Sequence, residues 1–212
     1  VFGVQPLIKQ LLVKNAKGAL IICNDVKDAR EYVSALTAMG EKVSYLPDKE
    51  DELIFIRNKS GENIRERIKA FYEILTGKTD YAVATVSSLL SLYPNKDDYL
   101  SHVVTLKVGE ERDLLEIVSI LSSCGYKRTS QVTDAGEFSL RGDILDVFPL
   151  NTQSAVRIEF FGDEVEKIRN FDAETQVSKD ELESIGIAPF AEIFSFDADI
   201  ADKVRNSLPK GL

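Results

Sequence analysis

The chain is poor in the residues that staple small domains or bind metals. Its 212 residues include two cysteines, one histidine, one methionine and no tryptophan. Cys23 and Cys124 are too few for a disulfide framework or a cysteine-based zinc site, and His102 alone excludes a histidine-rich metal site. We therefore expect no metal, and a core built by hydrophobic burial, for which the length is ample.

Long hydrophobic runs are also missing. No apolar stretch approaches the roughly 18 residues of a membrane span, and no segment has the layout of a signal peptide. With 44% hydrophobic and 29% charged residues, the composition is that of an ordinary soluble globular protein. We expect a cytoplasmic protein with no membrane partner.

Positive charge is in short supply as well. The formal net charge is −9 and the sequence pI is near 4.8. Proteins that hold a phosphate backbone by bulk electrostatics are usually basic. The charge therefore opposes nonspecific DNA binding by this chain, while a local basic spot stays open.

The triplet Gly77-Lys78-Thr79 has the ending of a phosphate-binding loop. The complete loop, G-x-x-x-x-G-K-[ST], leaves a strand and opens a helix. Here Tyr72 stands where the first glycine belongs. Apolar residues at three- and four-residue spacing also predict a helix over 61–76, followed by a strand over 81–86. Because this order is inverted, we interpret the triplet as a helix C-cap and turn.

Strands and helices alternate along the first hundred residues. The run ALIICND (19–25) is typical of a strand buried on both faces, and its last two residues can cap the helix that follows. The other elements are strands over 42–48, 81–86 and 102–109, and helices over 26–40, 61–76 and 87–94, the last with Ser87 as cap. This alternation predicts a parallel sheet covered on both faces.

The pattern changes after about residue 108. An amphipathic helix is expected within 110–126, with Gly125 as its cap. Short strands separated by turn residues then predict antiparallel hairpins; they cover 127–132, 137–142, 143–149, 155–162 and 163–172, before a short helical piece over 179–187. We expect a smaller α+β domain, separated from the α/β domain near 103–110, with few contacts besides the connection.

The stretch AVRIEFFG (155–162) divides its side chains between two faces. Alternation places Val156, Ile158 and Phe160 on one face and Arg157, Glu159 and Phe161 on the other. The second set has two interpretations that the pattern leaves open. In the first interpretation, Phe161 packs under a loop and Arg157 pairs with a carboxylate. In the second, the two residues form a partner-binding patch, since arginine and aromatic residues are enriched among interface hot spots.

Two longer segments, GEFSLRGDILDVFP (136–149) and VRIEFFGDEVEKIRNFDAETQVS (156–178), carry a family resemblance. Together they resemble a motif pair shared by the bacterial DNA-repair proteins UvrB and Mfd, in order and in spacing. The strong resemblance covers roughly 104–190. Residues 1–103 fit this family only by their α/β layout and position.

Within the family, UvrB is an ATPase with an intact phosphate loop near its start. The corresponding VFGVQPLIKQLL retains Gly3 and Lys9 but lacks the second glycine and the Lys-Ser/Thr pair, and NFDAETQVS is closer to Mfd. The chain thus resembles the N-terminal UvrB-like module of Mfd. The resemblance implies a degenerate RecA/helicase-like parallel-sheet domain (1–105), a UvrA-docking α+β domain with an antiparallel sheet (106–190), and the start of a return into the first domain (191–212).

The resemblance also implies a function. In this family the module recruits UvrA and so links stalled RNA polymerase to nucleotide excision repair. The family's docking positions fall on Arg141, Arg157 and Phe161, all expected at the surface, and Glu159 is a fourth candidate that could orient the arginine. Asp143 and Asp146 are expected to cap or brace neighbouring strands rather than to contact a partner. No catalytic residue or cofactor is implied for this segment; the intact parent would be an ATP-dependent DNA translocase that contacts DNA and RNA polymerase.

Two other functions stay open. One is an active ATPase or damage-verification module of UvrB type, which the broken phosphate loop opposes. The other is a direct DNA-binding domain, which the net charge opposes. A nucleotide titration separates the first from a docking module, and a salt-dependent DNA shift assay separates the second.

Overall fold

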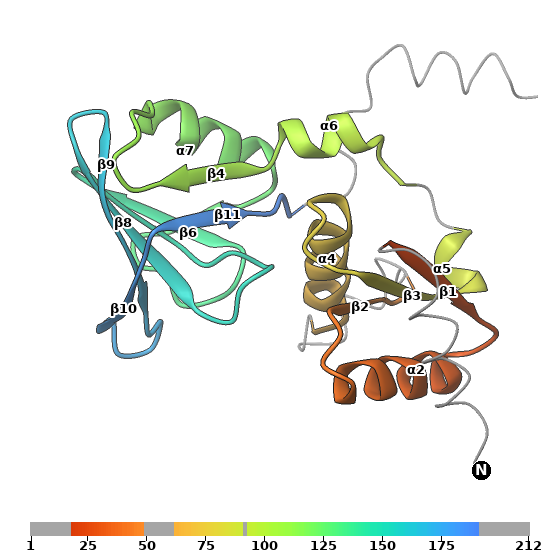
Figure 1. Cartoon of the computed structure of the whole chain (residues 1–212). Coiled ribbons are helices and arrows are strands. Elements are labelled where there is room, and N and C mark those ends of the chain that lie inside the picture. The colour runs from red at the N-terminus through yellow and green to blue at the C-terminus, as the bar shows by residue number, and fades with distance from the viewer. Residues whose placement is uncertain (1–17, 49–61, 91–92, 191–212) are drawn as a thin grey trace, which may run out of the picture.

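The computed structural model describes residues 18–48, 62–90 and 93–190 (Figure 1). Its helices are α2 (Val26–Ala38), α4 (Glu62–Leu75), α5 (Val86–Leu89), α6 (Lys96–Ser101) and α7 (Leu114–Ser123). Its strands are β1 (Ala19–Cys23), β2 (Val43–Leu46), β3 (Tyr81–Thr85), β4 (Val104–Lys107), β5 (Lys127–Arg128), β6 (Glu137–Arg141), β7 (Ile144–Val147), β8 (Ala155–Phe161), β9 (Glu164–Phe171), β10 (Ser178–Leu182) and β11 (Ser184–Ile187). Within these ranges no helix combines the length and apolar character needed to cross a membrane.

The first sheet is parallel, in the order β1-β3-β2, which confirms the α/β character of this part of the chain. Helix α2 packs with Tyr45 and Val83, while α4 packs with the next residues along the same strands, Leu46 and Ala84. Successive residues of a strand point to opposite faces. The two helices therefore cover opposite faces of the sheet.

Strand β1 differs from its prediction. Leu20 and Ile22 are 52% and 56% exposed, so the strand is buried on one face only. It lies at one end of the described sheet, and α4 packs mainly over β2. An apolar run therefore does not ensure burial on both faces, because a covering helix must also reach that strand.

Helix ends follow the local sequence, with one correction. Asp25 caps α2, and Gly40 and Gly77 adopt positive φ angles of 81° and 69° just beyond α2 and α4. The Gly77 turn confirms the C-cap interpretation of the triplet. The cap of α5 is Thr85 rather than Ser87, because the Thr85 side chain accepts the N–H of the third residue of that helix. Helix α6, capped by Asn95, is absent from the sequence prediction.

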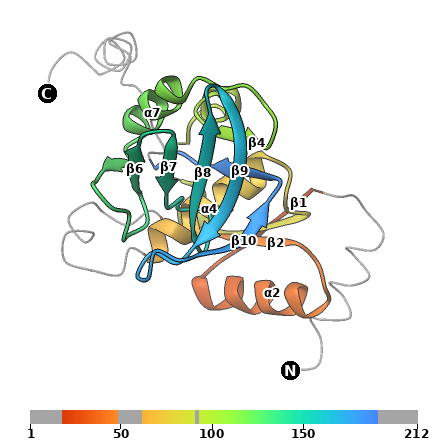
Figure 2. The ribbon, with the colours of Figure 1, turned by 90° about the vertical axis from the view of Figure 1, so that its left-hand side faces the viewer.

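The second half of the chain builds a six-stranded sheet in the order β10-β9-β8-β7-β6-β5. Every pairing is antiparallel except that between β5 and β6. Figure 2 shows β6 to β10 side by side. Helix α7 buries Ile117 and Leu121 against one face, which is the inner face of the sheet. The opposite side is called the outer face below.

The structure of segment 179–187 differs from the prediction. A helical piece was expected there, but the structure forms β10 and β11. Strand β11 pairs with β4 along its whole length and buries Ile187. Backbone pairing with a distant strand therefore outweighs the weak helical preference of a short segment. The strand expected over 127–132 also shortens to the two residues of β5.

Helix α4 joins the two halves of the molecule (Figure 1). Its residues Ile68 and Tyr72 form a buried cluster with Leu150 and Ala188. Arg65 of the same helix donates a hydrogen bond of 2.8 Å to the carbonyl oxygen of Thr152. Distant segments of the second half thus meet one face of α4, which adds a contact between the halves to their connection along the chain.

Candidate functional site

Strand β8 divides its side chains as its alternation predicts. Val156, Ile158 and Phe160 are buried on the inner face. Phe161 points the other way and is 78% exposed. A register shift in the β8–β9 pairing lies between Glu159 and Phe160, close to the tip of the hairpin. An exposed phenyl ring at a hairpin tip gains nothing for the fold, which makes it the first candidate contact.

A buried carboxylate holds two arginines together on the outer face. Asp146 Oδ2 accepts a hydrogen bond of 2.6 Å from Arg141 Nη2. The same carboxylate receives Arg157 side-on, at 2.7 Å from Nε to Oδ1 and 2.9 Å from Nη2 to Oδ2. The side chain of Asp146 is 1% exposed. The expectation that Asp146 braces neighbouring strands is confirmed, and the carboxylate joins two of the predicted docking residues.

The two arginines differ in exposure. Arg141 is 51% exposed, whereas Arg157 is 16% exposed. The Arg157 guanidinium also lies 4.8 Å from the centre of the Phe171 ring. Hydrogen bonds with Asp146 raise the pKa of Arg157 above its ordinary value, although burial acts in the opposite direction. The expectation that all candidate side chains lie at the surface is therefore wrong for Arg157, because Asp146 and Phe171 enclose it.

Glu159 does not orient Arg157. Its carboxylate instead accepts a hydrogen bond from Arg169 Nη2, on strand β9. Arg157 and Arg169 lie directly opposite one another across the two strands. Like charges in that position repel, and each arginine here pairs with a carboxylate, Arg157 with Asp146 and Arg169 with Glu159. Sequence reasoning missed Arg169 and Phe171, because the register shift breaks the simple alternation of β9.

The hairpin tip that carries Phe161 is fixed on both sides. The N–H of Phe160 donates a 2.8 Å hydrogen bond to the carbonyl oxygen of Asp143. On the other side, Phe161 pairs with Glu164, and Glu164 pairs with Glu111. The phenyl ring is thus carried on ordered backbone, beside two exposed carboxylates.

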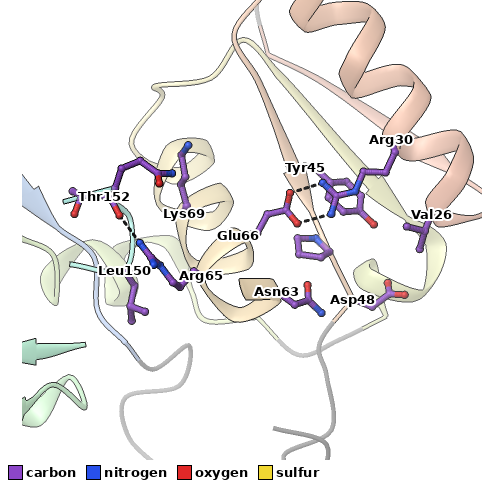
Figure 3. A pocket seen from close by; sticks show the side chains of 12 residues that line it. Val26, Arg30, Tyr45, Asp48, Asn63, Arg65, Glu66, Lys69, Leu150 and Thr152 are labelled. Atoms are coloured by element: carbon purple, nitrogen blue, oxygen red, sulfur yellow. Dashed lines mark hydrogen bonds and ion pairs between the residues drawn. The ribbon is translucent and has the colours of Figure 1, made fainter. Parts of the chain in front are cut away.

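A cleft of about 900 Å³ opens beside the first sheet, where β2 ends at Pro47 and Asp48 (Figure 3). This end of a parallel sheet is where doubly wound folds bind ligands. Its basic side chains already have partners: Arg30 holds Glu66 by two bonds of 2.5 and 2.6 Å, Arg65 donates to Thr152, and Lys69 lies 3.9 Å from Glu73. Arg30 and Lys69 of the described lining are thus paired with carboxylates, whereas the partner of Arg65 is a neutral carbonyl oxygen.

The turn after β1 has its own carboxylate at the helix N-terminus. Asp25 Oδ1 accepts the N–H of Asp28 at 2.9 Å, in the place where a phosphate would meet the N-terminus of a helix. The triplet at 77–79 is likewise occupied by internal bonds. Lys78 Nζ donates to the Tyr72 hydroxyl at 2.8 Å, and Thr79 Oγ1 donates to the Lys42 carbonyl oxygen at 3.0 Å. Gly3 and Lys9 lie outside the described residues.

Metal-binding side chains are scattered in the described ranges. No group of three or more histidine, cysteine, aspartate or glutamate residues is placed there to hold an ion. Cys23 and Cys124 are free and buried. Burial raises the pKa of both thiols, which keeps them in the unreactive protonated form.

Comparisons with known proteins cover the second half of the chain and part of the first. Residues 104–193 match the family described as UvrB interaction domain. A transcription-repair-coupling factor of Staphylococcus aureus is 39% identical over 129 residues, which cover 61% of this chain and 11% of that protein. The one from Bacillus subtilis is 32% identical over 179 residues, or 84% of this chain and 15% of that protein. The resemblance found in the sequence is thus confirmed, and the chain spans a small part of the length of these relatives.

Proposed function

We propose that this chain, whose residues 104–193 form a UvrB interaction domain and which is homologous to the transcription-repair-coupling factors, recruits UvrA. In this proposal it links RNA polymerase stalled at a DNA lesion to nucleotide excision repair. The similarity to two coupling factors supports the repair role. The match to the interaction domain supports docking as the contribution of this segment.

One observation supports the outer face as the docking site. Phe161 stands 78% exposed on the same side of the sheet as the Arg141–Asp146–Arg157 cluster. An aromatic ring supplies apolar contact area, and a guanidinium supplies directional hydrogen bonds to carboxylates. We assign Arg141 and Phe161 as direct contacts, and Arg157 as a contact through its remaining exposed edge. Glu159 contributes by holding Arg169 in the same layer.

We further propose three parts for the chain. Residues 1–105 form a degenerate RecA/helicase-like domain, 106–190 the UvrA-docking domain, and 191–212 the start of the return into the first domain. The parallel order β1-β3-β2 supports the first assignment. The carboxylate of Asp25 at the N-terminus of α2 supports loss of the nucleotide site.

The remaining assignments concern the intact protein. We propose that this segment itself is not an enzyme and takes no cofactor, since the Lys78 and Thr79 side chains are bonded within the protein. The intact parent would be a cytoplasmic, ATP-dependent DNA translocase with RNA polymerase and DNA as further partners. The family resemblance is the support for these roles.

The test is a titration of the purified chain with UvrA. Phe161→Ala should weaken binding by about 2 kcal/mol, roughly thirtyfold. The matched control is Leu115→Ala, which removes another exposed apolar side chain, from helix α7 on the inner side of the sheet. Its affinity for UvrA should equal that of the unchanged chain. Absence of binding by the unchanged chain, or equal losses for the two variants, would contradict the proposal.

A further inference from the structure

Asp146 is the most enclosed charge on the outer face. Its side chain is 1% exposed, while its two arginine partners are 51% and 16% exposed. Strand β7 lies between β6 and β8, so the arginines reach the carboxylate from both sides. Arg157 lies directly opposite Asp146, and Arg141 approaches from two residues further along. One carboxylate thus determines the position of two guanidinium groups.

The arrangement lies apart from the main apolar core of the six-stranded sheet. The core of the sheet lies on the inner face, among apolar side chains packed under α7. A buried ion pair is weak evidence for stability, because desolvation of the charges offsets much of their attraction. A buried carboxylate is, however, an effective means of holding long side chains in a single orientation before a partner arrives.

Arg141 and Arg157 each have N–H donors that are not bonded to Asp146. Arg141 uses one N–H on Asp146, and Arg157 uses two, out of the five that each guanidinium carries. The three groups sum to one net positive charge. The unused donors lie on the same side of the sheet as Phe161, and a carboxylate is the partner group that matches a guanidinium fork.

We infer that Asp146 is a positioning residue of the docking face: it holds Arg141 and Arg157 so that their free donors meet carboxylates of UvrA. The inference rests on the proposed function. Asp146 makes no contact with the partner itself and acts through the two arginines. Its removal frees both side chains, and their ordering must then occur during binding.

The experiment measures the UvrA affinity of the chain carrying Asp146→Asn, which keeps the size of the side chain and removes its charge. The affinity should fall by about tenfold, because each mobile arginine adds an ordering cost to binding. Asp172→Asn is the matched control. Asp172 also holds a cation, Lys179 Nζ at 2.9 Å, but at the surface beyond the end of β9; its variant should bind UvrA like the unchanged chain.

A double-mutant cycle with Arg141→Ala separates positioning from a general loss of structure. If Asp146 acts through the arginines, Asp146→Asn should cost clearly less affinity in the Arg141→Ala background. Additive losses would overturn the inference, as would unchanged binding by a folded Asp146→Asn chain. Should Asp146→Asn melt below the assay temperature, Arg157→Lys keeps the charge and removes the two-point bond. Wild-type binding by Arg157→Lys would then overturn the inference.

Failure of the inference can be told apart from failure of the proposed function. If Phe161→Ala and Arg141→Ala lower the affinity for UvrA but Asp146→Asn does not, only the positioning role of Asp146 is refuted. If Phe161→Ala and Arg141→Ala bind UvrA like the unchanged chain, both the proposed docking face and the positioning role of Asp146 are refuted.

Discussion

Tyr72 of helix α4 lies directly against the backbone of Gly186 in strand β11. A Cβ atom built at position 186 would overlap the tyrosine hydroxyl and crowd the ring carbon that carries it. The ring is buried, and Lys78 Nζ donates to its hydroxyl at 2.8 Å. The contact joins α4, which covers the parallel sheet, to β11, which follows the last strand of the six-stranded sheet in the chain.

Gly186→Ala should therefore destabilise the protein. Overpacking a tight contact costs about 1–3 kcal/mol of unfolding free energy, and Tyr72 has little room to move. Urea unfolding measures the loss. Ser184→Ala, an exposed position in the same strand, should leave the unfolding free energy unchanged. Tyr72→Phe removes the nearest atom and should recover part of the loss in the Gly186→Ala background. Equal stability of Gly186→Ala and the unchanged chain would contradict the close contact.

Arg157→Ala should lower stability as well as UvrA binding, unlike Phe161→Ala. Without Arg157, the buried Asp146 keeps a single partner, Arg141, and an incompletely satisfied buried carboxylate costs about 1–3 kcal/mol. Phe161→Ala should stay within about 0.5 kcal/mol, as exposed positions do. Thermal melting of both variants checks the difference. As a control, Lys179→Ala breaks an exposed ion pair and should lower the melting temperature less than Arg157→Ala does. Equal melting temperatures of Arg157→Ala and Phe161→Ala would contradict the claim that the enclosed Arg157 stabilises the fold.

Calorimetric titration of the chain with Mg-ATP should give no binding heat. The turn after β1 has no glycine, and the Asp25 carboxylate occupies the N-terminus of α2, where it would repel a phosphate. Asp25→Ser keeps a capping side chain and removes the charge, and its titration should be equally flat, because the short turn still cannot wrap a phosphate. Micromolar affinity in either chain would restore the ATPase alternative.

The turn after β9 should make a pH-dependent contribution to stability. Bonds from Lys179 and from the N–H groups of Thr175 and Glu174 lower the pKa of Asp172 from 3.8 to about 2. Because the folded pKa lies below the unfolded one, the stabilisation is present above about pH 4 and is lost as the pH falls through about 2. Urea midpoints should therefore separate Asp172→Asn from the unchanged chain at pH 7 and converge near pH 2. A constant difference between the two chains across this pH range would contradict the lowered pKa.

Local patterns in the sequence determined much of this protein. The alternation of β8 placed Val156, Ile158 and Phe160 inward and Phe161 outward, as the structure has them. The capping residue Asp25 and the glycine at 77 marked a helix start and a helix end. The motif pair after residue 136 indicated a family that the comparisons confirm. These features depend on neighbours in the chain, so they can be predicted from the order of residues.

The tertiary structure decided which groups meet. The sequence does not show that Asp146 lies between Arg141 and Arg157, or that Glu159 pairs with Arg169, because both depend on the register of neighbouring strands. Strands β10 and β11 replaced an expected helix, since β11 pairs with β4, a strand far back in the chain. Arg157 is largely buried because Asp146 and Phe171, on the two neighbouring strands, enclose it. Burial and charge pairing are properties of juxtaposition, and only the folded sheet brings these residues side by side.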